Sequence, residues 1–232
     1  MNSSTVTLTS HDGQAFGAYL SLPPTGTGPG LVLIQEIWGV NAHIRAVADQ
    51  YAMDGYVVMA PDVFWRQGAG VDLKYDAADT QEAYRLMRNL DGPNAAADLV
   101  TTAQALRQRP ERTGKVGALG FCMGGRLAFQ LAASGAIDAA VCYYGGGIQN
   151  QLDLAPSIQV PLLFHYGERD AHIPPPAVDA VRAAFASHAN AQVHVYADAD
   201  HGFNCWGRPA YHQQAAALAR GRTLAWLSEQ LD

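Results

Sequence analysis

Short apolar runs recur along the chain, and longer stretches typical of helices separate them. The runs occupy residues 31–35 (LVLIQ), 56–60 (YVVMA), 115–120 (KVGALG), 139–144 (AAVCYY), 162–167 (LLFHYG) and 192–196 (QVHVY). The first five are continuously apolar rather than alternating, which is typical of strands buried on both faces of a parallel sheet. The predicted helices span residues 42–54, 77–90, 94–109, 123–134, 175–188 and 210–231. This alternation predicts an α/β fold, a three-layer sandwich around a mostly parallel sheet.

The first 22 residues add an antiparallel element to this pattern. Residues 5–10 and 16–22 flank the turn signal His11-Asp12-Gly13, which predicts a hairpin at the sheet edge and makes the sheet mixed. The Pro- and Gly-rich segment 22–30 predicts a loop between two strands. The chain has 232 residues, 49% of them hydrophobic, and no repeat or obvious linker. We therefore expect a single domain over residues 1–232.

Charge and composition exclude several classes of partner. The 15 Lys and Arg residues against 21 Asp and Glu give a formal charge of −6, so nucleic acid is a poor candidate partner. No apolar run reaches the roughly 18–20 residues that a bilayer crossing needs, so we expect no membrane insertion. The start of the sequence carries no secretion signal, and three cysteines do not make a disulfide framework. We expect a cytoplasmic monomer with reduced thiols.

The segment KVGALGFCMGGRLAFQLAA, residues 115–133, carries the clearest chemical signal. An apolar strand runs into Gly120-Phe121-Cys122-Met123-Gly124 and then directly into a helix, which is the pattern of a nucleophile elbow with Cys in place of Ser. Glycines on both sides avoid collisions of Cβ atoms, and the helix N-terminus favours the reactive thiolate. The alternative is that Cys122 is one more buried thiol. The agreement of strand, glycine spacing and helix favours the nucleophile.

A nucleophilic cysteine needs a base, and the base needs a carboxylate that orients it. In an elbow of this kind both follow later strands in the order nucleophile, acid, histidine. We predict Asp170, after run 162–167, and His201, after run 192–196, with His172 as a weaker alternative for the base. The remaining histidines are interpreted as packing or surface residues. His165 and His194 fall inside strands, His11 lies in the hairpin, and the residues on helices far from this edge are His43, His188 and His212. Glu168, Asp198 and Asp200 are interpreted as solvated loop carboxylates.

Neither a metal nor a nucleotide cofactor is indicated by the motifs. The cluster of Asp198, Asp200 and His201 has no second His or Cys at ligand spacing, so no metal site is predicted. The sequence has no G-x-G-x-x-G after its first strand and no G-x-x-x-x-G-K-[ST], so no cofactor is expected.

The chain resembles the dienelactone hydrolase family, a branch of the α/β-hydrolases. The resemblance depends on six segments, at residues 35–45 (QEIWGVNAHIR), 60–68 (APDVFWRQG), 120–125 (GFCMGG), 143–147 (YYGGG), 165–174 (HYGERDAHIP) and 198–203 (DADHGF). It implies an α/β-hydrolase fold, a Cys122-His201-Asp170 triad and an oxyanion hole from the backbone N–H groups of Ile37 and Met123. It also implies that Glu36 meets the thiol and helps to deprotonate it when substrate arrives.

The sequence departs from the family where dienelactone hydrolases hold the substrate's carboxylate. The two arginines of that clamp match Thr80 and Cys205 here, and a hydroxyl and a thiol cannot make charge-assisted bidentate bonds. We therefore expect neutral esters or lactones to be preferred, unless an arginine from a neighbouring turn takes over. The candidates for that role are Arg85, Arg88 and Arg208.

These observations predict a hydrolase of small carboxylic esters or lactones that works through an acyl-thioester. Because a thiolate leaves more readily than an alkoxide, the substrate should have a good leaving group. The substrate pocket is expected to use Trp38, Tyr84, Tyr144, Phe203 and Arg208, with Phe64, Trp65, Met87 and Trp206 as further candidates for its lining. The alternatives are a hydrolase-like protein that binds a small ligand without turnover and a hydrolase of another acyl donor, such as a thioester or a larger ester.

Overall fold

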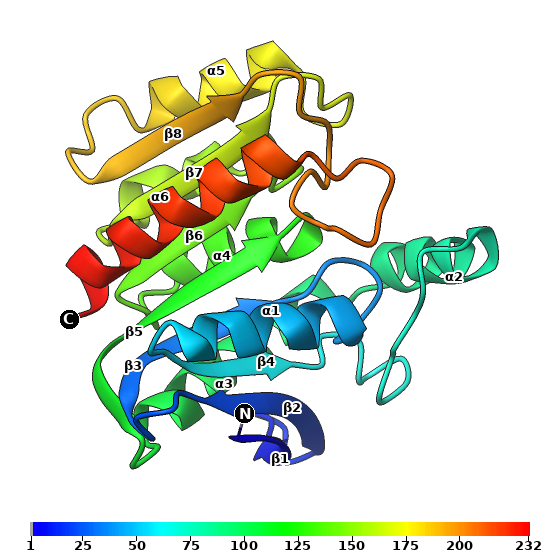
Figure 1. Cartoon of the computed structure of the whole chain (residues 1–232), viewed down its shortest axis with the longest axis vertical. Helices are drawn as coiled ribbons and strands as arrows, with labels where there is room; N and C mark the ends of the chain where they lie inside the picture. The colour runs from blue at the N-terminus through cyan, green and yellow to red at the C-terminus, as the bar shows by residue number, and fades with distance from the viewer. Residues whose placement is uncertain (1) are drawn as a thin grey trace.

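The computed structural model describes residues 2–232, and most of them surround one eight-stranded sheet (Figure 1). The spatial order of the strands is β1-β2-β4-β3-β5-β6-β7-β8. Their bounds are β1 Asn2–Thr9, β2 Ala15–Leu22, β3 Gly28–Ile34, β4 Val57–Pro61, β5 Arg112–Phe121, β6 Ala139–Tyr143, β7 Leu162–Gly167 and β8 Ala191–Tyr196. The β1–β2 and β2–β4 pairs are antiparallel and the other pairs are parallel. The predictions of a mixed, mostly parallel sheet and of an N-terminal edge hairpin are therefore confirmed.

Helices cover both faces of the sheet, as the sequence predicted. The helices are α1 Ala42–Met53, α2 Ala77–Arg88, α3 Gly92–Arg107, α4 Met123–Ala133, α5 Pro175–Ala184 and α6 Gln213–Leu231, with the short 3-10 helices η1 Ile148–Asn150 and η2 Leu152–Ser157. In Figure 1, α1 and α6 lie in front of the sheet, while α3 and α4 lie behind it. Helix α2 projects beyond the ends of the strands, on the side to which the arrows of the parallel strands point. None of the described helices is long and apolar enough to span a bilayer.

Two predicted helices are shorter in the structure than in the sequence interpretation. Helix α5 ends at Ala184, because Phe185 packs into the core against Phe164 and the chain then turns through residues 185–188. Helix α6 begins at Gln213 rather than at residue 210. Its N-cap is His212, whose Nδ1 accepts a hydrogen bond from the N–H of Ala215 at 3.2 Å.

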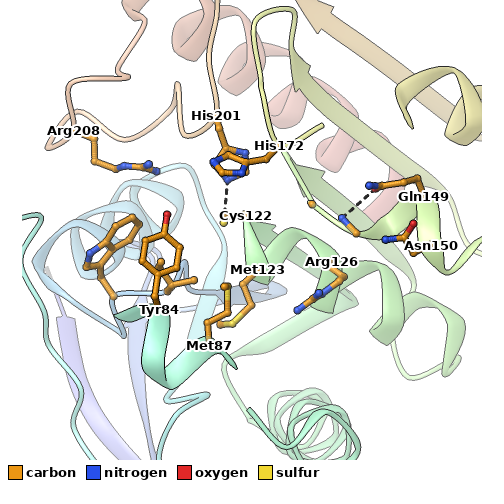
Figure 2. A pocket seen from close by; sticks show the side chains of 14 residues that line it. Tyr84, Met87, Cys122, Met123, Arg126, Gln149, Asn150, His172, His201 and Arg208 are labelled. Carbon is orange, nitrogen blue, oxygen red and sulfur yellow. Dashed lines mark hydrogen bonds between the residues drawn. The ribbon is translucent and has the colours of Figure 1, made fainter. Parts of the chain in front are cut away.

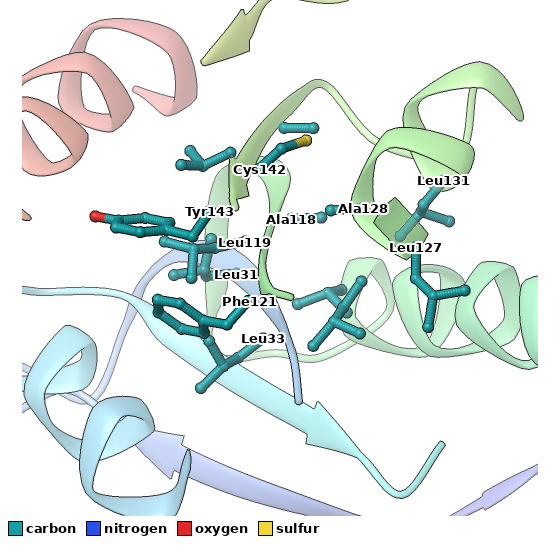
Figure 3. Packing of buried hydrophobic residues seen from close by; sticks show 14 of the residues in the cluster. Leu31, Leu33, Ala118, Leu119, Phe121, Leu127, Ala128, Leu131, Cys142 and Tyr143 are labelled. Carbon is teal, nitrogen blue, oxygen red and sulfur yellow. The ribbon is translucent and has the colours of Figure 1, made fainter. Parts of the chain in front are cut away.

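The central strand β5 explains why the predicted strands are continuously apolar. Leu119 and Phe121 point to one face, where they meet Leu31, Leu33 and Tyr143, and Ala118 points to the other, toward α4 (Figure 3). Successive side chains of a strand alternate between faces, and helices cover both faces here. The strand therefore tolerates no polar side chain along its buried half. This rigid strand ends directly beneath Cys122.

Candidate active site

Cys122 occupies the sharp turn between β5 and α4. Its backbone has φ 57° and ψ −118°, a conformation that residues other than glycine rarely adopt. A Cβ added at Gly120 would lie 2.0 Å from the carbonyl oxygen of Gly124, so the turn requires glycine there. The N–H of Cys122 donates to the carbonyl of Tyr143 at 3.0 Å, which ties the turn to β6. The predicted strand–turn–helix geometry is confirmed, and the thiol is held at the positive end of α4.

Asp170 and His201 reach Cys122 from two later loops. Asp170 follows β7, and His201 follows β8. His201 Nε2 lies 3.0 Å from Cys122 Sγ, and His201 Nδ1 lies 2.7 Å from Asp170 Oδ2 (Figure 2). The other carboxylate oxygen of Asp170 accepts hydrogen bonds from the backbone N–H groups of His172 and Ile173 at 2.8 and 3.2 Å. The three side chains form one chain of hydrogen bonds from the thiol to a fixed carboxylate.

The protonation of His201 follows from these contacts. Burial lowers the pKa of His201, but its hydrogen bonds with Asp170 and Cys122 outweigh burial and raise the pKa to about 10. The contacts with Asp170 and Cys122 therefore favour the protonated imidazole over the neutral one.

His172 lines the same cavity as His201 but makes a different contact. Its ring packs edge-on against His201 with 5.0 Å between the ring centroids. His165 is buried in β7, where its two nitrogens pair with Tyr196 and Thr223. The ring of His194 stacks on that of His165, with 5.8 Å between the two ring centroids. The interpretation of His165 and His194 as packing residues is therefore confirmed.

Glu36 lies beside the elbow, just after the end of β3, and its side chain is only 2% exposed. Burial raises the pKa of Glu36, and the charge of Arg208 opposes that rise. Glu36 Oε1 accepts a hydrogen bond from Arg208 Nη1 at 3.1 Å, while Glu36 Oε2 is buried with no hydrogen-bond partner among residues 2–232. In this structure Cys122 Sγ forms a hydrogen bond with His201, and Glu36 forms one with Arg208. This arrangement differs from the direct contact between glutamate and thiol that the resemblance implies.

Helix α1 brings His43 close to this edge, which corrects the placement inferred from the sequence. Side-chain ligand atoms of Glu36, His43 and Cys205 all lie within 4.8 Å of one another, and all three side chains are buried. The sequence did not reveal this because Cys205 is remote along the chain from Glu36 and His43. The group could in principle hold a metal ion. However, Arg208 already neutralises Glu36, and a second cation beside this guanidinium would be repelled.

A cavity of about 320 Å³ opens at Cys122 (Figure 2). Its lining comprises Ile37, Trp38, Tyr84, Met87, Cys122, Met123, Arg126, Gly146, Gly147, Gln149, Asn150, His172, His201 and Arg208. Of the residues predicted to line a substrate pocket, those that border this cavity are Trp38, Tyr84, Met87 and Arg208. Ile37 and Met123, the predicted oxyanion residues, also border it. The N–H of Met123 lies in the first turn of α4, where backbone N–H groups have no intrahelical partner.

Tyr144 and Phe203 were expected in the pocket, and the structure places both in the core instead. Both are fully buried, and their ring centroids lie 5.2 Å apart. Tyr144 follows β6 with φ 35°, and its ring packs edge-on against His201 with 5.2 Å between the ring centroids; it does not line the cavity. Phe64, Trp65 and Trp206 do not line the cavity either: Phe64 is in the core, Trp65 stacks on Phe16, and Trp206 packs on His43 at the surface.

The two residues that match the family's arginine clamp, Thr80 and Cys205, do not line the cavity. Thr80 Oγ1 accepts a hydrogen bond from Trp38 Nε1 at 3.4 Å, and Cys205 is fully buried away from the cavity. Of the three substitute arginines, Arg208 borders the cavity, with its guanidinium 4.7 Å from the centre of the Trp38 ring. Arg85 pairs with Glu82 at the surface, and Arg88 is exposed.

Sequence reasoning missed one side of the cavity. That side consists of Arg126 on α4 and the glycine-rich turn leading into η1, with Gln149 and Asn150. A signal for Arg126 was present, because residue 126 lies one helical turn after the elbow cysteine and so on the same helix face. No sequence pattern indicates that η1 folds back over this helix.

A cysteine on a strand–helix elbow at the carboxyl edge of a mostly parallel sheet, with an acid and a histidine after later strands, defines an α/β-hydrolase. The model of the dienelactone hydrolase family matches residues 16–231, and the chain belongs to this family. It is a hydrolase of the dienelactone hydrolase type.

Individual relatives support the same assignment. A carboxymethylenebutenolidase of Pseudomonas putida is 37% identical over 224 residues, which cover 96% of this chain and 95% of the relative. Carboxymethylenebutenolidase 1 of Cupriavidus pinatubonensis is 33% identical, covering 98% of this chain and 97% of its own length. Among solved structures, a Klebsiella pneumoniae protein assigned as a dienelactone hydrolase superposes with a TM-score of 0.86 at 30% identity, covering 98% of both chains. The dienelactone hydrolase-like promiscuous phosphotriesterase P91 from metagenomic libraries superposes with a TM-score of 0.79 at 25% identity over the whole of both chains.

Proposed function

We propose that the protein hydrolyses small carboxylic esters or lactones through Cys122, His201 and Asp170, with a covalent acyl-thioester intermediate. The observation that carries the proposal is the chain of contacts at the elbow, 3.0 Å from Cys122 Sγ to His201 Nε2 and 2.7 Å from His201 Nδ1 to Asp170 Oδ2. A nucleophile, a base and an orienting acid within hydrogen-bond reach are what acyl transfer requires.

In the first half-reaction, the thiolate of Cys122 adds to the carbonyl carbon of the substrate. The carbonyl oxygen becomes negative and accepts hydrogen bonds from the N–H groups of Ile37 and Met123, which border the cavity. The bond between the carbon and the leaving oxygen then breaks, and the protonated His201 gives its proton to that oxygen. Cys122 now holds the acyl group as a thioester.

In the second half-reaction, neutral His201 takes a proton from a water molecule as the water attacks the thioester carbon. The carbon–sulfur bond breaks, the acid is released, and the thiolate returns beside a protonated His201. Asp170 holds the ring in the required orientation throughout and stabilises its positive charge. Hydrogen bonds from the N–H groups of His172 and Ile173 fix Asp170 in turn.

Glu36 and Arg208 act on the charge of the thiol. A carboxylate near a thiol disfavours the thiolate and a guanidinium favours it, so the paired Glu36 and Arg208 exert opposite influences at the elbow. A substrate that draws Arg208 away from Glu36 would free the carboxylate to act on the thiol. This is the role that the resemblance to dienelactone hydrolases implies for Glu36.

The substrate class follows from the leaving-group requirement and the cavity. A thiolate is expelled in preference to an alkoxide, so enol esters, aryl esters and strained lactones should react and amides should not. The cavity of about 320 Å³, with Trp38, Tyr84 and Met87 on one side, suits a small and partly apolar molecule. The names of the curated relatives, carboxymethylenebutenolidases, support an unsaturated lactone as one candidate substrate.

The test is a panel of lactones, aryl esters and thioesters assayed with the wild-type protein and with Cys122→Ala. We expect turnover of aryl esters or lactones by the wild type, a rapid burst equal to the enzyme concentration when deacylation is slow, and neither in Cys122→Ala. Binding without turnover in every assay would contradict the proposal and favour a ligand-binding protein. Turnover of thioesters alone would move the substrate class to another acyl donor.

A further inference from the structure

Arg126 places a positive charge in the cavity close to Cys122. Its backbone N–H donates to the carbonyl oxygen of Cys122 at 3.2 Å, so the two residues lie one helical turn apart at the start of α4. The side chain of Arg126 borders the cavity on the side opposite Tyr84 and Arg208 (Figure 2).

This charge has no counter-ion in the part of the chain that the structure describes. Twelve ion pairs join residues in the range 2–232, and Arg126 takes part in none of them. Its Nε is buried and makes no hydrogen bond to these residues. Arg208, by contrast, is already paired with Glu36. A guanidinium that is partly removed from water and left without a partner strongly favours an anion beside it.

The turn that packs on Arg126 also carries a neutral donor at the cavity wall. The backbone of Gly147 lies over Arg126, where an added Cβ would stand 3.3 Å from Arg126 Cδ and Nη1, and its φ of 93° favours glycine. Gln149 Oε1 accepts a hydrogen bond from the N–H of Gly147 at 3.1 Å. This bond fixes the amide so that Gln149 Nε2 remains a donor at the cavity wall. Two donor groups of this kind suit a carboxylate.

We propose that Arg126, with Gln149 on the same wall of the cavity, binds a carboxylate on the acyl part of the substrate. The inference rests on the hydrolysis proposed above and narrows its substrates to half-esters of dicarboxylic acids and lactones that carry a carboxylate. The leaving oxygen has to reach His201, and in Figure 2 Cys122 lies between His201 and Arg126. The acyl chain, and not the leaving group, therefore points to Arg126.

This assignment changes the substrate preference inferred from Thr80 and Cys205. Thr80 lies on α2 and Cys205 lies close to Arg208 in sequence, whereas Arg126 lies on the opposite wall of the cavity from Tyr84 and Arg208. The missing clamp therefore does not make the site neutral. Instead, the carboxylate of the substrate binds at Arg126, on the opposite side of Cys122 from Arg208.

The test compares the 4-nitrophenyl monoester of adipic acid with its methyl ester, which has the same leaving group and no charge. We expect the wild type to prefer the free acid in kcat/KM by at least about tenfold, because hydrogen bonds to charged groups are the strong ones. Arg126→Gln should lower this preference by about 10- to 100-fold, mainly through KM, and Arg126→Lys should retain part of it. Arg85→Gln is the matched control, because Arg85 is exposed and paired with Glu82, and it should keep the wild-type preference.

A second measurement separates the carboxylate site from the hydrolysis. Calorimetric titration of Cys122→Ala with adipate should show binding that Arg126→Gln, added to this variant, weakens by at least about tenfold. Equal kcat/KM for the acid and its methyl ester in the wild type, or a preference that survives Arg126→Gln, would overturn the proposal. If the wild type hydrolyses neither ester, the proposed function fails, and the titration still decides whether Arg126 binds a carboxylate.

Discussion

Glu36 Oε1 accepts a hydrogen bond from Arg208 Nη1 at 3.1 Å, across 172 residues of sequence. The pair lies beside the elbow that carries Cys122, and Glu36 is almost completely buried. An isolated carboxylate in such a place would take up a proton, and burial indeed raises the pKa of Glu36 while Arg208 opposes the rise. The ion pair therefore opposes the protonation of Glu36 beside the elbow.

The first prediction tests the influence of this ion pair on the thiol by removing each partner in turn. Glu36→Gln removes a negative charge and leaves Arg208 unpaired, so the apparent pKa for alkylation of Cys122 should fall, while ester turnover slows. Arg208→Gln removes the positive charge and should raise that apparent pKa. The measurement is the rate of iodoacetamide alkylation against pH. The same alkylation profile in both variants would rule out an influence of the pair on the thiol.

The second prediction concerns the nucleophile. Cys122→Ala should lower ester hydrolysis by at least about 10³-fold and leave the fold intact, because every bond-making step passes through this sulfur. Cys142→Ala is the matched control, since Cys142 is fully buried in β6, where burial raises the pKa of its thiol. It should keep its activity and lose about 1–2 kcal/mol of unfolding free energy. Steady-state kinetics and urea unfolding measure the two effects, and wild-type turnover by Cys122→Ala would refute the assignment.

The third prediction ranks the base and the acid. His201→Ala should cost at least as much activity as Asp170→Asn, because His201 transfers protons whereas Asp170 orients the ring and stabilises its charge. His172→Ala should be the mildest of the three, because the ring of His172 packs against His201 and the 3.0 Å contact with Cys122 belongs to His201. If His172→Ala were inactive and His201→Ala active, the base would be His172.

The fourth prediction is the pH dependence that follows from the raised pKa of His201. A group whose pKa is raised by folding stabilises the folded state fully below its unfolded value, near 6.5, and this contribution is lost as the pH rises through the folded value of about 10. The unfolding free energy of the wild type minus that of His201→Gln should therefore decrease between pH 6.5 and 10. Activity should also fall near pH 10, because the leaving group needs the proton of His201. A constant stability difference across this range would contradict a raised pKa.

The fifth prediction tests the close packing of the elbow. Gly120→Ala would force a Cβ to within 2.0 Å of the carbonyl oxygen of Gly124, so it should lower the unfolding free energy by about 3 kcal/mol or more. Gly221→Ala is the control, because Gly221 lies within α6 and an added Cβ would meet nothing within 4 Å. It should raise the unfolding free energy by about 0.5–1 kcal/mol. Thermal or urea unfolding compares the two, and equal stability of both variants would show that the elbow can relax.

Local patterns in the sequence were enough to predict the buried strands, the N-terminal hairpin and the elbow. The continuously apolar strands follow from burial on both faces, the hairpin follows from its turn, and the elbow at Cys122 follows from Gly120 and the helix directly after it. Because parallel strands end at one edge, residues just after β7 and β8 had to lie near the elbow. This rule was enough to predict Asp170 and His201.

The positions that depend on how separate segments pack were decided only by the tertiary structure. Tyr144 and Phe203 stand next to the expected edge in sequence, but both rings are fully buried and pack against each other. Cys205 lies close to Glu36 and His43, and the turn at Gly147 packs on Arg126, through contacts between elements that are not adjacent in the sequence. Periodicity and motifs report which face of an element is buried and where an element ends. They do not report which loop covers a given side chain, because that depends on packing between elements that have no fixed spacing in the sequence.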